Sequence, residues 1–111
     1  MSKEYSLGID LGGTKIAAAL CNGGKILKKV VFPTSASNGT QHILNTMIDA
    51  AEQAMDGHTV ENILGIGIGA AGQINSETGE VIYSPNLNWY NVPLAESLEK
   101  KFKIPVKVLN D

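Results

Sequence analysis

Near its amino terminus the chain reads Leu7-Gly8-Ile9-Asp10-Leu11-Gly12-Gly13-Thr14-Lys15. An apolar strand here ends in a carboxylate, and two glycines, a hydroxyl and an ammonium group follow it. Glycine lets backbone N–H groups approach an anion with no Cβ in the way. One carboxylate can help to hold Mg²⁺, because this ion keeps most of its waters. The segment therefore suits the phosphates of a nucleotide and their metal ion, which would contact Asp10, Gly12, Gly13, Thr14 and Lys15.

The same residues also fit a plainer interpretation, a tight β-turn that needs Gly-Gly and in which Asp10 hydrogen-bonds its own backbone. The segment alone leaves both interpretations open. A Walker P-loop is excluded, because Thr14-Lys15 reverses the order of lysine and hydroxyl residue that this motif requires. The residues that follow also run into a hairpin turn at residues 22–24 instead of a helix.

The composition is that of one ordinary domain. The chain has 111 residues, of which 43% are hydrophobic and 18% charged, and its formal net charge is −2. This charge gives no basic surface for nucleic acid, and the apolar runs are too short to span a bilayer. A single cysteine, Cys21, excludes an internal disulfide and a zinc cluster. Residues 1–4 do not read as a signal peptide, so we expect a cytoplasmic protein without a membrane partner.

Hydrophobic periodicity and turn residues predict a mixed α/β sheet. Residues 5–10, 15–21 and 25–32 read as three strands of an antiparallel meander, with Asn22-Gly23-Gly24 as a hairpin signal. Residues 40–56 and 93–102 read as amphipathic helices. Apolar runs predict strands at residues 62–68 and 106–109, and a short extended piece lies at 80–83. Residues 69–79 are expected to form a loop and residues 85–89 irregular chain. A meander followed by βαβ crossovers implies helices packed on a mixed sheet.

In such a sheet the strands at residues 5–10, 62–68 and 106–109 run parallel, and ligands bind outside the carboxyl ends of parallel strands. The second and third of these ends carry Gly69-Ala70-Ala71-Gly72 and Asn110-Asp111. We therefore expect the carboxylates of Asp10 and Asp111, two glycine-containing loops and the amide of Asn110 to share one rim. Asp111 could accept the proton of an attacking hydroxyl in phosphoryl transfer, although Asn-Asp also begins ordinary turns.

Residues 67–72 match the pattern G-x-G-x-x-G. A dinucleotide-binding fingerprint should open directly into a helix, whereas loop and strand residues follow here. The small residues fit a close approach to a polar ligand such as a sugar ring, or a strand exit that needs them only for packing.

Several segments together resemble the amino-terminal lobe of ROK sugar kinases. They are residues 7–20, residues 65–72, Ser84-Pro85-Asn86-Leu87-Asn88-Trp89 with Asn91-Val92-Pro93-Leu94, and Pro105-Val106 with Asn110-Asp111. This family contains glucokinases, fructokinases and N-acetylmannosamine kinases as well as sugar-responsive repressors. The resemblance covers essentially the whole chain. It implies the ribonuclease H-like fold of actin-type ATPases, with ATP and sugar bound between two lobes.

The resemblance also implies roles for single residues. Asp10, Gly12, Gly13, Thr14 and Lys15 correspond to the phosphate-binding hairpin, with Asp10 at Mg²⁺. Gly72 and Gln73 would line the sugar pocket, Asn110 would bind a sugar hydroxyl, and Asp111 would be the general base. Family members often have Pro-Gly-Pro-Val-Asp where this chain has Ala70-Ala71-Gly72-Gln73-Ile74-Asn75, so the identity of the sugar stays open.

The expected function is ATP-dependent phosphorylation of a sugar hydroxyl, with residues 1–111 as the amino-terminal lobe. The family's Glu-x-x-His segment, its cysteine-rich zinc motif and its adenine-binding lobe have no counterpart here. We therefore expect the second lobe and the zinc site to be absent and the isolated chain to be inactive. Repressors of the family carry a helix-turn-helix domain ahead of the hairpin, and six residues precede Leu7, which favours the kinase over a sugar-sensing repressor or a non-catalytic fragment. Apolar surface at the final strand would favour a homo-oligomer.

Overall fold

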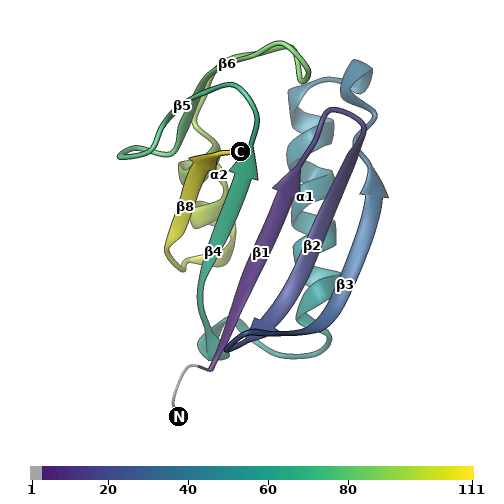
Figure 1. The fold of residues 1–111 in the computed structure, drawn as a ribbon, viewed down its shortest axis with the longest axis vertical. Coiled ribbons are helices and arrows are strands. Elements are labelled where there is room, and N and C mark those ends of the chain that lie inside the picture. The colour runs from purple at the N-terminus through teal and green to yellow at the C-terminus, as the bar shows by residue number, and fades with distance from the viewer. Residues whose placement is uncertain (1–3) are drawn as a thin grey trace.

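A five-stranded mixed sheet forms the centre of the molecule in the computed structural model, which describes residues 4–111 (Figure 1). Its strand order is β3-β2-β1-β4-β8. The meander consists of β1 (Tyr5–Leu11), β2 (Lys15–Asn22) and β3 (Lys25–Pro33). β1 pairs in parallel with β4 (Ile63–Ala70), and β4 in parallel with β8 (Val106–Asn110), so the predicted parallel strands are confirmed. Residues 1–3, where we expect no signal peptide, lie outside the described residues.

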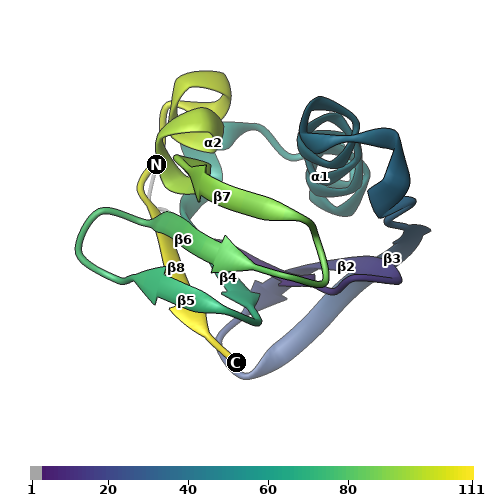
Figure 2. The same ribbon diagram turned by 90° about the horizontal axis from the view of Figure 1, so that it is seen from above.

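Both α-helices pack on the same face of this sheet (Figure 2). They are α1 (Thr40–Met55), which follows the 3₁₀ turn η1 (Ala36–Asn38), and α2 (Leu94–Phe102). A second 3₁₀ turn, η2 (Val60–Asn62), leads into β4. Side chains of a strand alternate between its faces, so Leu7 and Ile9 of β1 are buried in the core while Asp10 is exposed. The helix residues that complete the core are Ile43, Met47, Ala50, Ala51, Ala54, Met55, Leu94, Ala95, Leu98 and Phe102.

A second, three-stranded antiparallel sheet lies over the ends of β4 and β8 (Figures 1 and 2). It consists of β5 (Gln73–Asn75), β6 (Glu80–Ser84) and β7 (Trp89–Val92). Only β6 was predicted, because the loop expected at residues 69–79 contains β5 and the irregular chain expected at residues 85–89 runs into β7. β5 has three residues, and Asn75 ends it by accepting the N–H groups of Glu77 and Thr78. Such short polar strands are set by tertiary pairing and not by their own pattern.

The face of the large sheet opposite the helices is lined mostly by small residues. Those on its three inner strands are Gly8, Ala17, Ala19, Gly67 and Gly69. α2 covers one side of β8, where Val106 and Val108 are buried, whereas Leu109 is 58% exposed. The expected apolar surface at β8 is thus present on one face, and the homo-oligomer stays a prediction. Within residues 4–111, no helix has the length and apolar character needed to cross a membrane.

Gly79, just before β6, contacts α2 and so connects the small sheet to this helix. Its carbonyl accepts the N–H of Ala95 in the first turn of α2 at 3.1 Å, its φ is +75°, and a Cβ placed on it would overlap the Cβ of Ala95. The close approach therefore requires glycine for space as well as for backbone conformation.

We expect Gly79→Ala to lower the free energy of unfolding by about 3 kcal/mol, because left-handed strain and overpacking act together. Gly57→Ala is the matched control, since Gly57 has φ +87° with no atom within 4 Å of its ideal Cβ. Its expected loss is about 1 kcal/mol, from strain alone. Urea denaturation monitored by circular dichroism measures the free energy of unfolding of both variants. Equal losses of stability in the two variants would contradict a packing role for Gly79.

Candidate active site

The carboxyl ends of β1, β4 and β8 meet at one rim (Figure 1). Asp10 is the cross-strand partner of Gly69, Ala70 is the partner of Asn110, and the Asp111 N–H donates to the Ala70 carbonyl at 3.1 Å. A Cβ on Gly69 would overlap Oδ1 of Asp111, so the Asp111 carboxylate lies directly over this glycine. The structure thus brings both carboxylates beside the same position of β4.

Asp10 and Asp111 also line the same hollow, of about 380 Å³, on the open face of the sheet. The floor of this hollow consists of the small residues of β1, β2 and β4, and Ile26 and Lys29 of β3 lie at one side. Because the floor carries no side chain larger than the methyl group of alanine, a ligand can approach the backbone of three strands at once. A hollow with two carboxylates at one end can hold a polar ligand together with a cation.

The turn between β1 and β2, residues 12–14, is held tightly from inside the protein. The Gly12 N–H donates to the Lys15 carbonyl at 3.0 Å. Thr34 Oγ1 donates to the Gly12 carbonyl at 2.7 Å, and the Thr34 N–H donates to the Thr14 carbonyl at 2.9 Å. An ideal Cβ on Gly13 would lie 2.9 Å from Cβ of Asn86. Sequence reasoning missed Thr34 and Asn86, because nothing in the pattern around a polar loop residue indicates that it contacts a turn 20 or more positions away.

The outer side of this turn presents donors. Thr14 and Lys15 are exposed. Within residues 4–111, the N–H groups of Gly13 and Thr14 donate to no protein acceptor, and Lys15 pairs with no carboxylate. Backbone N–H groups, a hydroxyl and an ammonium group are the donors that phosphate oxygens accept. The predicted phosphate-binding residues Gly12, Gly13, Thr14 and Lys15 thus form one continuous surface next to Asp10.

The residues predicted for the sugar lie on the other side of Asp111. The Asn110 side chain donates through Nδ2 to the Gly72 carbonyl. Gly72 has φ +125°, and a Cβ on it would overlap the Tyr83 carbonyl, so glycine is required there. Gln73 follows it, is exposed and pairs with Tyr83. Gly72, Gln73 and Asn110 are therefore neighbours, and their amide groups and the Asn110 Oδ1 could bind hydroxyl groups of a ligand.

The chemistry of these donors fits a magnesium–nucleotide pair. The described residues contain no group of three His, Cys, Asp or Glu side chains that could hold a metal ion by themselves. Mg²⁺ is commonly held by one or two carboxylates together with water and phosphate oxygens. Asp10, exposed beside the turn between β1 and β2, is suited to that kind of site.

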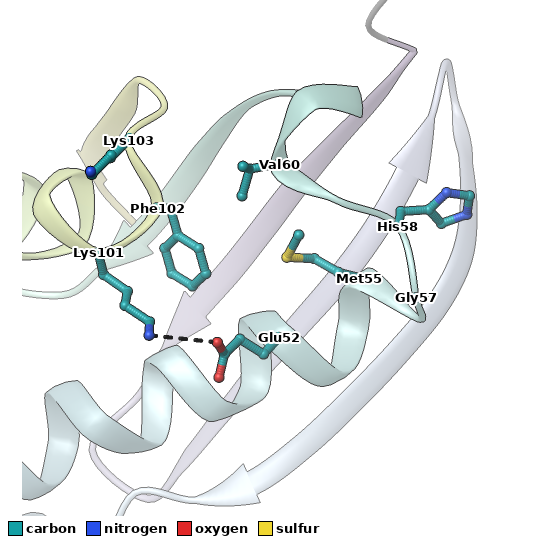
Figure 3. Close-up of a pocket in the computed structure, with 8 residues that line it drawn as sticks. All are labelled: Glu52, Met55, Gly57, His58, Val60, Lys101, Phe102 and Lys103. Atoms are coloured by element: carbon teal, nitrogen blue, oxygen red, sulfur yellow. Dashed lines mark ion pairs between the residues drawn. The ribbon is translucent and has the colours of Figure 1, made fainter.

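A larger hollow, of about 510 Å³, lies at the opposite end of the strands (Figure 3). Met55, Val60 and Phe102 form its apolar part, and Lys101 Nζ lies 3.8 Å from Glu52 Oε2. The ring of His58 points away from the other side chains and packs on Tyr5, with 4.4 Å between the ring centroids. None of the predicted site residues lines this hollow. The candidate site is therefore the rim at the carboxyl ends, where ligands of α/β sheets bind.

Comparison with known proteins identifies relatives of two kinds. The glucokinase of Halalkalibacterium halodurans is 37% identical over 114 aligned residues, which span 100% of this chain and 34% of that protein. The glucokinase of Thermotoga maritima is 38% identical, over 100% of this chain and 35% of its own length. A xylose repressor of Caldicellulosiruptor bescii is 35% identical over 95% of this chain and 27% of its own length. The chain thus spans about a third of the length of these glucokinases.

Solved structures share the fold. A ROK family glucokinase from Streptomyces griseus, in complex with glucose and AMPPNP, superposes with a TM-score of 0.85 at 33% identity, over 96% of this chain and 33% of that chain. The ROK hexokinase from Thermus thermophilus gives a TM-score of 0.82, also at 33% identity, over 96% of this chain and 35% of that chain. The expected ribonuclease H-like lobe of an actin-type ATPase is confirmed. The family model described as "ROK family" matches residues 6–111. This chain belongs to the ROK family.

Proposed function

We propose that this chain is the amino-terminal lobe of an ATP-dependent sugar kinase. One observation carries the proposal: the Asp111 carboxylate lies over Gly69, on the same hollow as Asp10. The phosphate-binding turn lies on one side of this pair and the Asn110–Gly72 contact on the other. This order matches a transfer in which phosphate arrives from one side and a sugar hydroxyl from the other.

In the proposed reaction a sugar hydroxyl attacks the γ-phosphorus of ATP. Asp111 accepts the hydroxyl proton as the new O–P bond forms, and the bond to the leaving ADP breaks. Asn110, Gly72 and Gln73 orient the sugar so that this hydroxyl faces Asp111. The N–H groups of the turn, with Thr14 and Lys15, stabilise negative charge on the phosphates. Mg²⁺, held by Asp10, would neutralise charge on the phosphate oxygens.

The proposed partners are therefore a small sugar and ATP, in the cytoplasm. The names of the glucokinase relatives and the complex of the Streptomyces griseus enzyme with glucose and AMPPNP support this choice. Glucose is the first sugar to test. We propose that this lobe contains no zinc site. We also propose that the adenine contacts and further sugar contacts come from a second lobe.

A second candidate is a sugar-sensing repressor lobe that binds its ligand without phosphoryl transfer. The match to the Caldicellulosiruptor bescii xylose repressor favours it. Both candidates use Asn110 and Gly72 to bind a sugar. They differ in whether Asp111 and the phosphate-binding turn act on ATP.

A chimera separates the two candidates. Residues 1–111 replace the matching third of the Halalkalibacterium halodurans glucokinase, and glucose-dependent ADP release is measured. We expect an active chimera in which Asp111→Asn lowers kcat by roughly 10²- to 10⁴-fold, because the general base is lost, with little change in the KM for ATP. Asp49→Asn, an exposed carboxylate on α1, is the control and should leave kcat unchanged. A folded chimera that binds glucose but releases no ADP would favour the repressor.

The isolated chain should be inactive. It offers phosphate and sugar contacts on one side only, so water would reach the reacting atoms and ATP would not be held in line with the hydroxyl. We expect no ADP release above background with glucose, mannose, fructose or N-acetylmannosamine. Turnover approaching that of ordinary kinases, about 1–100 s⁻¹, would contradict the need for a second lobe.

The position of Asp111 above Gly69 gives a further test in the chimera. Gly69→Ala should displace the Asp111 carboxylate, which overlaps the new Cβ, and should lower kcat by about tenfold or more through misplacement of the base. Gly67→Ala is the matched control on the same face of β4, with no atom within 4 Å of its ideal Cβ. Equal kcat values for the two variants would contradict the assignment of Asp111 as base.

A further inference from the structure

Thr34 is a fully buried polar residue directly behind the phosphate-binding turn. It follows the last residue of β3, and its exposed fraction is 0%. Burying a hydroxyl is costly unless it finds a hydrogen-bond partner. Its partner is the Gly12 carbonyl at 2.7 Å, while its own N–H donates to the Thr14 carbonyl at 2.9 Å. One residue therefore binds the carbonyl groups at both ends of the turn.

These two hydrogen bonds determine which groups the turn presents to a ligand. A carbonyl oxygen carries partial negative charge and repels a phosphate oxygen, whereas an N–H group attracts it. Thr34 directs the carbonyls of Gly12 and Thr14 toward the protein interior. The N–H groups of Gly13 and Thr14, which donate to no acceptor among residues 4–111, stay available for an anion.

Asn86 restricts the same turn from another side. The ideal Cβ position of Gly13 lies 2.9 Å from Cβ and 3.2 Å from the carbonyl oxygen of Asn86, in the connection between β6 and β7. The turn is thus confined between Asn86 and Thr34 before any ligand arrives. A binding group that is ordered in advance loses less entropy when its ligand binds.

We propose that Thr34 is a positioning residue for phosphate binding. It contacts no phosphate itself and acts through the carbonyls of Gly12 and Thr14. The inference rests on the proposed function, because it takes the turn to be the phosphate site. A merely structural Thr34 would change the stability of the protein and leave the phosphate affinity of the folded protein unaltered.

The test uses the ¹⁵N-labelled 111-residue chain, with magnesium tripolyphosphate as the probe and the amide signals of residues 12–15 as the readout. Thr34→Val keeps the shape and removes the hydroxyl, and Thr34→Ser keeps the hydroxyl. We expect the Kd for tripolyphosphate to rise about tenfold for Thr34→Val, the effect of one lost hydrogen bond to a partly buried carbonyl, and to stay within about twofold for Thr34→Ser. Hydrogen exchange at the Gly12 amide should accelerate only in the valine variant.

Ser97→Ala is the matched control. Ser97 Oγ donates to the Pro93 carbonyl at 2.9 Å at the start of α2, so this variant also removes a hydroxyl from a backbone carbonyl, on the other helix. It should leave both tripolyphosphate binding and Gly12 exchange unchanged. Should Thr34→Val not fold, Thr34→Cys replaces it, since a thiol is a weaker donor, and its affinity should fall below that of the serine variant.

Each outcome counts for or against one of the two claims. Wild-type affinity and wild-type Gly12 exchange in Thr34→Val would overturn the positioning role. An absence of any response at residues 12–15 in the wild-type chain would contradict the proposed phosphate site. In that case the exchange rate of the Gly12 amide in the valine and serine variants still decides whether Thr34 positions the turn.

Discussion

The parallel pairing of β1, β4 and β8 is the constraint on which the candidate site depends. Its register places Asp10 opposite Gly69 and Asn110 opposite Ala70. A shift of one residue in either pair would turn a carboxylate from the open face of the sheet to the face that packs on the helices, because side chains alternate along a strand. The buried residues Leu7, Ile9, Ile66, Ile68 and Val108 prevent such a shift, since it would expose them. The core that stabilises the lobe thus also orients its two acidic side chains.

At two positions of the site another group lies where a side chain would be, and this explains why glycine is needed there. At Gly69 the absent side chain makes room for the Asp111 carboxylate, and at Gly72 for the carbonyl of Tyr83. By contrast, Gly8 and Gly67 have no atom within 4 Å of an ideal Cβ. The glycines in and around the site are therefore of two kinds, and only those in contact with other groups position a side chain or a strand of the site.

The sequence was sufficient to predict the large sheet, because its strands and helices are long, periodic and bounded by turn residues such as Asn22-Gly23. It was also sufficient to predict that Asp10, Gly72, Asn110 and Asp111 gather at one rim, since that follows from the order of the parallel strands. The small sheet could not be predicted from the sequence, because β5 and β7 pair through short polar segments whose conformation depends on their neighbours. Thr34 and Asn86 were missed for a related reason: their contacts with the turn join segments far apart in the chain, which no local pattern encodes.

The residues that we propose for sugar binding (the sugar side) and those that we propose for phosphate binding (the phosphate side) are supported by different parts of the lobe. The sugar side depends on the contact of Asn110 with Gly72 and on the small sheet that follows Gly72. The phosphate side depends on the β1–β2 turn and on Thr34 at the end of β3. They meet where Gly13 approaches Asn86. Because the two sides are supported by separate hydrogen bonds, a change at Thr34 need not disturb the contact of Asn110 with Gly72. The two proposed functions differ in the same way, since phosphoryl transfer needs both sides, whereas ligand binding without transfer needs only the sugar side.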